Sequence, residues 1–212
     1  MRLRPSGQKG PVATQISSFV DYQEKEAWTW EHLALTRARV ITGPDDLRRA
    51  VEKAIHDTLV RQRDREKIAA DVIDMRGRIE ADKGTKNIWD LKQVRGGLVD
   101  LEFIAQYLQL IHAHAHPEVL DQNTLGAFQK LAAAGVLPMA DAEELIAAVR
   151  LIHDLTQVLR LCLEGGFDPA TAPSGLKSLL ARAGNAPTFA QLEANLKETL
   201  GRVHALFETL VR

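Results

Sequence analysis

Apolar residues along this sequence recur mostly at intervals of three and four, the spacing that places them on one side of an α-helix. The clearest series follows Asp141 and consists of Leu145, Ala148, Ile152, Leu155, Leu159 and Cys162. Its alternating three- and four-residue steps predict a long helix whose apolar stripe is covered by a partner helix. On this pattern Cys162 is expected to be packed against a neighbour.

Similar stripes predict about seven helices in all, joined by short connections. The others are expected from Ser18 to Ile41, around Leu47–Ile55, after Asp64, after Gly97, from Asn123 to Gly135, from Leu176 to Ala183 and from Phe189 onward. Residues 84–95, which include Trp89, are expected to form a loop, and any internal boundary is expected there. Helices with short connections predict an all-α fold, arranged as an antiparallel helical bundle.

The first 17 residues have a different character. Arg2-Leu3-Arg4 alternates like a strand before Pro5-Ser6-Gly7, and Gly10-Pro11 makes a second break. Two short strands around a turn fit this pattern, although such a hairpin is too small to be stable alone. We therefore expect residues 1–17 to be the last strands of a larger sheet, and residues 18–212 to form the helical domain.

Composition narrows the class of protein further. The 212 residues are 45% hydrophobic and 26% charged, with a net charge of -1, so nothing marks the chain as a nucleic-acid or membrane-surface binder. No apolar run reaches the roughly 18 residues that span a bilayer. Cys162 is the only cysteine, which excludes an intrachain disulfide and suits a reducing compartment. A cytoplasmic location is predicted.

The most distinctive motif is the pair Gly96-Gly97, directly before a predicted helix. Backbone N–H groups at such a turn, together with the helix N-terminus, can hold a phosphate, and Lys92 and Arg95 would add positive charge. The alternative is an ordinary glycine loop in which Asp100 complements the helix dipole. Further along the same helix, Glu102 shares a face with Gln106, facing either a cleft or solvent.

A second group of charges lies on the first long helix. If Glu31 is partly buried near Arg37 and Arg39, the group is either a structural ion pair or a site that orients a nucleotide. His112 and His116 are spaced for one helix face, but Pro117 follows and no third ligand is evident, so no metal site is expected. No nucleophile with a matched base and no carboxylate cluster is present. These patterns therefore predict no group of catalytic residues within this chain.

Two blocks, taken in order, resemble a known family. The first is Arg2-Leu3-Arg4-Pro5-Ser6-Gly7, followed by Trp28-Thr29-Trp30-Glu31 and Arg37-Ala38-Arg39; the second runs from Asp90 through Gly96-Gly97-Leu98-Val99-Asp100-Leu101-Glu102-Phe103 to Gln106. Together they are similar to bacterial glutamine synthetase adenylyltransferase, a two-headed enzyme that adds AMP to glutamine synthetase and removes it. The resemblance covers nearly the whole chain, more loosely after Gly165.

The resemblance implies a place within a larger enzyme. The family has two halves, each a nucleotidyltransferase domain followed by a helical domain. The residues of both blocks resemble those of the C-terminal, adenylylating half. The expected chemistry is transfer of AMP from ATP to a glutamine synthetase tyrosine, with Mg²⁺ held by carboxylates of the catalytic domain. Those carboxylates precede Met1 in the family's order, so this chain alone is expected to be inactive and to bind no cofactor tightly.

The resemblance also implies partners and candidate positions. Expected partners are glutamine synthetase, a PII-type signal protein and the upstream catalytic domain, and neither nucleic acid nor membrane is among them. Candidate positions at the nucleotide or the domain interface are Arg2, Arg4, Glu31, Arg37, Arg39, Lys92, Gly96, Gly97, Asp100 and Glu102. Two alternatives stay open: a regulatory module that docks the PII-type protein or glutamine synthetase, and the related uridylyltransferase of PII.

Overall fold

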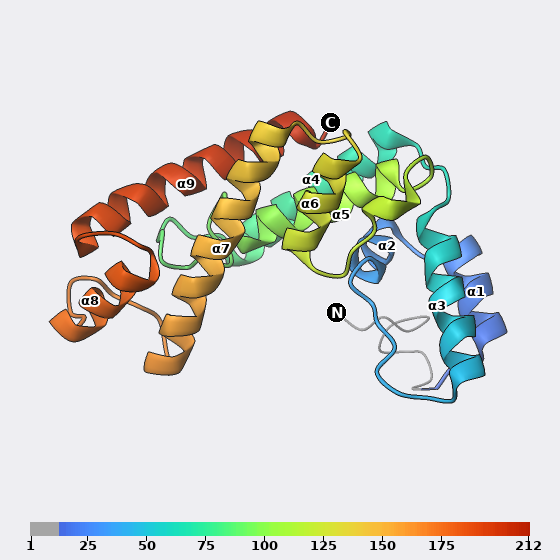
Figure 1. Ribbon diagram of the computed structural model, residues 1–212, viewed down its shortest axis with the longest axis horizontal. Helices are drawn as coiled ribbons and strands as arrows, with labels where there is room; N and C mark the ends of the chain where they lie inside the picture. Colours follow the sequence, from blue (N-terminus) through green and yellow to red (C-terminus); the bar gives the residue numbers. More distant parts are fainter. Residues whose placement is uncertain (1–12) are drawn as a thin grey trace. The chain divides into compact units, whose positions relative to one another are not determined.

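The computed structural model describes residues 13–212 of the chain (Figure 1). This part contains nine α-helices, one short 3₁₀ helix and no strand, which confirms the all-α prediction for the described residues. None of these helices combines the length and the apolar composition needed to cross a bilayer. The predicted pair of strands falls largely on residues 1–12, outside the described residues, and the antiparallel arrangement stays a prediction.

Contacts along the chain divide it into two compact units. One consists of residues up to Met75, Ala105–Val136 and Arg212; the other consists of Arg76–Ile104 and Leu137–Val211. Both divisions near the middle fall inside helices, α4 (Arg65–Lys83) and α5 (Leu98–His112), so each of these helices supplies residues to both units.

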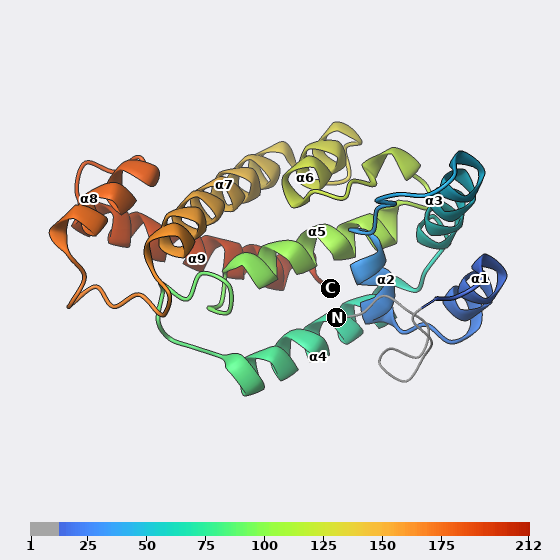
Figure 2. The same cartoon turned by 90° about the horizontal axis from the view of Figure 1, so that it is seen from below.

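The first unit is built from short and medium helices. Its complete elements are α1 (Ile16–Lys25), α2 (Thr29–Leu35), α3 (Asp45–Leu59), η2 (Pro117–Val119) and α6 (Thr124–Ala133). The α3 helix packs against both α1 and α2, and α1 and α3 lie side by side in Figures 1 and 2. Asn123 accepts hydrogen bonds from the backbone N–H groups of Leu125 and Gly126, so α6 begins at the position that the sequence predicts.

The single helix predicted from Ser18 to Ile41 is wrong, because the chain breaks after Lys25 and helix α2 ends at Leu35. The break is stabilised by Glu31 in the first turn of α2. Its carboxylate accepts the backbone N–H of Trp28 at 2.9 Å and the hydroxyl of Tyr22 at 2.8 Å. This carboxylate therefore caps α2 and holds it to the end of α1, which a continuous helix would not permit.

The second unit centres on three helices that all pack on one another: α7 (Met139–Cys162), α8 (Ser174–Ala183) and α9 (Phe189–Leu210) (Figure 1). The predicted loop between α4 and α5 inserts Trp89 into an aromatic cluster with Phe167 and Phe189, at centroid distances of 4.7 and 5.3 Å. The Trp89 Nε1–H donates to Glu193 at 3.1 Å, which satisfies the one polar group of the buried indole.

The apolar stripe of α7 is covered over only part of its length. Leu145, Ile152 and Leu155 are buried, as expected of a stripe with a partner helix. The prediction that Cys162 is packed is wrong, since this residue is exposed and its neighbour Leu161 is 85% exposed. The last turn of α7 extends past the residues that cover the stripe, and spacing along the sequence does not reveal where the cover ends.

Candidate functional site

The turn before α5 requires glycine at both positions of the Gly96-Gly97 pair. Gly96 has a φ of +76°, and a Cβ atom there would lie 1.8 Å from the carbonyl oxygen of Leu200 on α9. A Cβ on Gly97 would lie 2.6 Å from the carbonyl oxygen of Leu91. Both distances are far inside van der Waals contact, so the two glycines allow backbone segments to approach each other closely.

The N–H groups of this turn already have acceptors within the chain. The Gly96 N–H donates to the Asp100 carboxylate at 2.5 Å, the Gly97 N–H to the Val94 carbonyl at 2.9 Å, and the Leu98 N–H to the Leu91 carbonyl at 2.8 Å. A phosphate would have to displace these bonds. The geometry therefore favours the second interpretation of the motif. It is a structural turn in which the Asp100 carboxylate accepts a backbone N–H group at the start of α5.

Asp100 has a second partner that the sequence analysis missed. Its carboxylate pairs with the guanidinium of Arg76, and both side chains are buried. Arg76 also donates from Nη2 to the Gln93 carbonyl at 3.1 Å. One signal pointed to this residue, because Arg76 lies four positions after Val72, within the apolar stripe of α4. A buried charge at such a position requires a counter-charge.

The remaining candidates of this motif lie nearer the surface. Lys92 is exposed and Glu102 is half-buried. Arg95 donates from Nε to Glu80 at 2.9 Å, and this hydrogen bond raises the pKa of Arg95 and lowers that of Glu80. The structure thus gathers Gly96, Gly97 and Asp100 in one buried turn, while the nearby charges stay accessible.

In the first unit, Glu31 is only 2% exposed, and its described hydrogen bonds come from Tyr22 and Trp28. Arg37 and Arg39 are both exposed, so the burial expected for this group applies to the carboxylate alone. Arg2 and Arg4 lie outside the described residues.

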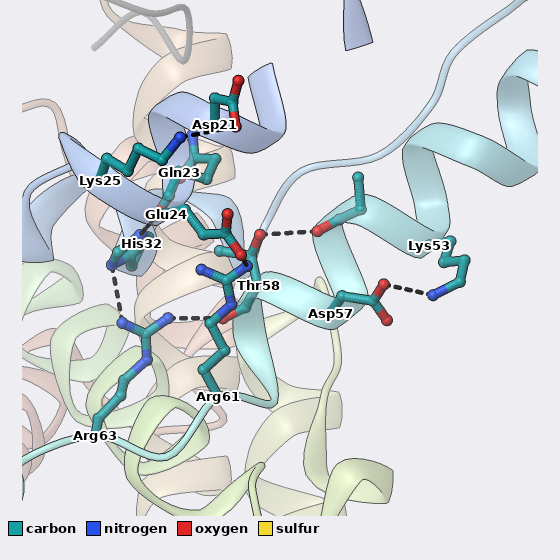
Figure 3. Close-up of polar contacts among 11 residues, drawn as sticks. Asp21, Gln23, Glu24, Lys25, His32, Lys53, Asp57, Thr58, Arg61 and Arg63 are labelled. Atoms are coloured by element: carbon teal, nitrogen blue, oxygen red, sulfur yellow. Dashed lines mark hydrogen bonds and ion pairs between the residues drawn. The ribbon is translucent and has the colours of Figure 1, made fainter. Parts of the chain in front are cut away.

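Next to Glu31, a buried histidine and a half-buried arginine form a hydrogen-bonded pair, shown in Figure 3. His32 contacts the Gln23 carbonyl through Nε2 at 3.1 Å and the Nη1 of Arg63 through Nδ1 at 2.9 Å. Because a guanidinium can only donate, Nδ1 accepts and Nε2 carries the proton. Burial and then the charge of Arg63 lower the pKa of His32 to about 4, so the imidazole is neutral at pH 7.

Arg63 is held by neutral partners. Its second terminal nitrogen, Nη2, donates to the Thr58 carbonyl at 2.8 Å (Figure 3). Burial and then the neighbouring positive charge of Arg61 lower the pKa of Arg63 to about 10. Sequence spacing did not indicate this pair, because His32 and Arg63 are 31 residues apart and belong to different elements.

A pocket of about 580 Å³ opens beside this pair, entirely within the first unit. Its walls include Trp28, Thr29, Arg63, Asp64, Lys67 and Asp71. Within residues 13–212, no group of three or more His, Cys, Asp or Glu side chains is placed to hold a metal ion. Helix α5 ends at His112, so His116 does not share a helix face with it.

Residues 65–211 match a family model described as GlnD PII-uridylyltransferase. This match covers more than half of the chain, and so the chain belongs to that family. Residues 1–54 match a second model, described as glutamate-ammonia ligase adenylyltransferase.

Relatives that align over the whole chain carry the adenylyltransferase description. The chain is 54% identical over 211 residues to a bifunctional glutamine synthetase adenylyltransferase/adenylyl-removing enzyme from Rhodopseudomonas palustris (strain BisB5), and 53% identical to an enzyme of the same description from Bradyrhizobium diazoefficiens. Each match covers 100% of this chain and 21% of the relative, so the chain spans about a fifth of their length. The resemblance found in the two sequence blocks is confirmed.

Proposed function

We propose that this chain is the helical domain that follows the adenylylating domain of a glutamine synthetase adenylyltransferase. The parent enzyme transfers AMP from MgATP to a tyrosine of glutamine synthetase, in the cytoplasm, under the control of a PII-type signal protein. The observation that carries this proposal is the alignment of the entire chain, at 54% identity, with a bifunctional enzyme of that description.

In this proposal the chain's own residues shape a domain and supply none of the metal ligands. The buried turn of Gly96, Gly97 and Asp100 holds the start of α5 in place. Exposed Lys92 and half-buried Glu102 lie close to it in sequence and are candidates for the interface with a neighbouring domain. Glu31 caps α2. The exposed residues Arg37 and Arg39 follow that helix and are further candidates for the interface with a neighbouring domain. The Mg²⁺ and ATP belong to the upstream catalytic domain.

AMP transfer to glutamine synthetase tests the proposal directly. Unmodified glutamine synthetase is incubated with MgATP and either this chain or a version extended upstream through the catalytic domain, and then weighed by intact-mass spectrometry. The expected result is AMP addition by the extended protein only, and loss of that addition when the upstream metal-binding carboxylates are replaced by amides. Transfer by the 212-residue chain alone, or by neither protein, contradicts the proposal.

A second candidate function is docking of a regulatory partner, and the uncovered end of α7 favours it. Leu161 is 85% exposed beside exposed Cys162, so the last turn of α7 presents an apolar side chain to solvent. A pull-down with the PII-type protein and with glutamine synthetase tests this function. Leu161→Glu is expected to abolish retention, whereas Met139→Glu, at the exposed start of the same helix, leaves it intact.

A further inference from the structure

The pocket next to His32 contains a positive charge that has no described negative partner. Arg63 is held by a neutral imidazole and a backbone carbonyl, and its Nε is buried without a hydrogen-bond acceptor among residues 13–212. The charged group that further lowers its pKa is Arg61, which is also positive. Arg61 itself is paired with Glu24 at 2.6 Å, so that carboxylate is already engaged.

A half-buried guanidinium without a counter-ion is unusual, because removing charge from water is costly unless an opposite charge replaces the solvent. Such a group is a natural receptor for an oxyanion, since its planar array of donors matches carboxylate and phosphate geometry. Lys67 lines the same pocket, is exposed, and has no ion pair among the described residues. Two cations therefore border one cavity.

The other walls of the pocket offer different chemistry. Trp28 is 71% exposed, which is far more than an indole that serves only packing would show. Three carboxylates also line the pocket, those of Glu26, Asp64 and Asp71. Two of them already act as acceptors: Asp71 receives the hydroxyl of Thr29, and one oxygen of Asp64 receives the backbone N–H of Lys67 at 3.1 Å. A flat apolar ring, carboxylate acceptors and two cations thus surround the same space.

We propose that this pocket binds a nucleoside monophosphate. The phosphate faces Arg63 and Lys67, the base stacks on Trp28, and the ribose hydroxyls donate to Asp64 and Asp71. The volume of about 580 Å³ lies in the range of ordinary small-molecule sites. The site lies within this chain and adds a binding function to the proposed one.

Calorimetric titration of the 212-residue chain with AMP, adenosine and inorganic phosphate tests the site. AMP is expected to bind, and raising the salt from 50 mM to 0.5 M is expected to weaken it, because the contacts to phosphate are ionic. Adenosine and inorganic phosphate each carry only part of the recognised chemistry, and each is expected to bind at least about tenfold more weakly than AMP, as expected when charge-assisted or stacking contacts are lost.

Matched variants locate the binding. Lys67→Ala is expected to weaken AMP binding roughly tenfold, as expected for the loss of one charge-assisted contact, whereas Lys83→Ala on the same helix removes an equal charge and leaves it unchanged. Trp28→Ala is expected to weaken binding to a similar degree, while Ile41→Ala, at an equally exposed apolar residue, has no effect. Both test residues are exposed, so folding is retained.

Three results overturn the proposal: no heat of binding with millimolar AMP, equal affinities for AMP and adenosine, or equal losses in the Lys67 and Lys83 variants. None of them depends on AMP transfer, because the titration uses the chain without glutamine synthetase or the catalytic domain. A failure here is therefore distinguishable from a failure of the proposed enzymatic role.

Discussion

The guanidinium of Arg76 and the carboxylate of Asp100 form an ion pair whose side chains are 1% and 0% exposed. The pair joins α4 to the first turn of α5, and the second carboxylate oxygen receives the N–H of Gly96. One aspartate therefore neutralises a buried cation and completes a turn at the same time. This double role explains the presence of a buried charged residue in the first turn of α5.

Replacing Asp100 by asparagine is expected to destabilise the chain by about 3–5 kcal/mol, because the charge of Arg76 is left buried without a partner. Urea unfolding followed by circular dichroism measures the change. Asp82→Asn serves as the control, since this side chain is 74% exposed and its loss is expected to cost less than about 1 kcal/mol. A difference below about 1 kcal/mol between the two variants would show that the buried pair contributes little.

Gly96→Ala is expected to cost more than about 3 kcal/mol, because the new Cβ overlaps the backbone of Leu200 and α9 must shift. Gly135→Ala isolates the conformational part of this cost. Gly135 also has a positive φ, of +71°, but nothing lies within 4 Å of its added Cβ, so about 1 kcal/mol is expected. Equal losses in thermal or urea unfolding would contradict the close approach of the two backbones.

The low pKa of His32 predicts a loss of stability in acid. The imidazole has a pKa of about 4 in the folded chain and 6.5 ordinarily, so the unfolded chain binds the proton more tightly. Its contribution is complete above pH 6.5 and is lost as the pH falls toward 4, with a size of about 3 kcal/mol at most.

Urea unfolding at several pH values checks this prediction by comparing the native chain with His32→Gln, which cannot titrate. The difference in unfolding free energy between the two proteins is expected to shrink steadily from pH 7 to pH 4. The contributions of the other titrating groups cancel in this difference, because both proteins contain them. A difference that stays constant over this range would mean that His32 is not held neutral by its surroundings.

Cys162 is expected to react with a thiol reagent in the native state. It is exposed at the end of α7, so modification requires no unfolding. One equivalent of Ellman's reagent is expected to react as fast in buffer as in urea, with the native circular dichroism unchanged. Reaction that appears only after denaturant is added would place the thiol inside the fold, as the apolar stripe first predicted.

Much of the helical structure is visible in local sequence. The α6 helix starts where Asn123 can cap it, and α8 and α9 lie close to the predicted limits, because caps and apolar spacing are properties of neighbouring residues. The break between α1 and α2 is not visible in this way. It depends on Glu31 receiving the hydroxyl of Tyr22, nine residues away, and a helix-length apolar pattern continues across it.

The candidate sites show the same difference between local sequence patterns and contacts that form only in the folded chain. The glycine pair and Asp100 stood out because glycine before a helix is a recognisable local pattern. Their role was left open by the sequence, since the backbone of Leu200 and the charge of Arg76 become neighbours only in three dimensions. His32 and Arg63 were not predicted, because two charged or polar residues 31 positions apart carry no joint pattern.

The contact between Gly96 and Leu200 also constrains the order in which the chain acquires its structure. The turn that starts α5 rests on a backbone segment synthesised about a hundred residues later. At roughly 5–20 residues per second, a ribosome needs about 5–20 seconds to supply it. During this interval the Gly96 turn lacks its native neighbour. The second unit can therefore complete its packing only near the end of its own synthesis.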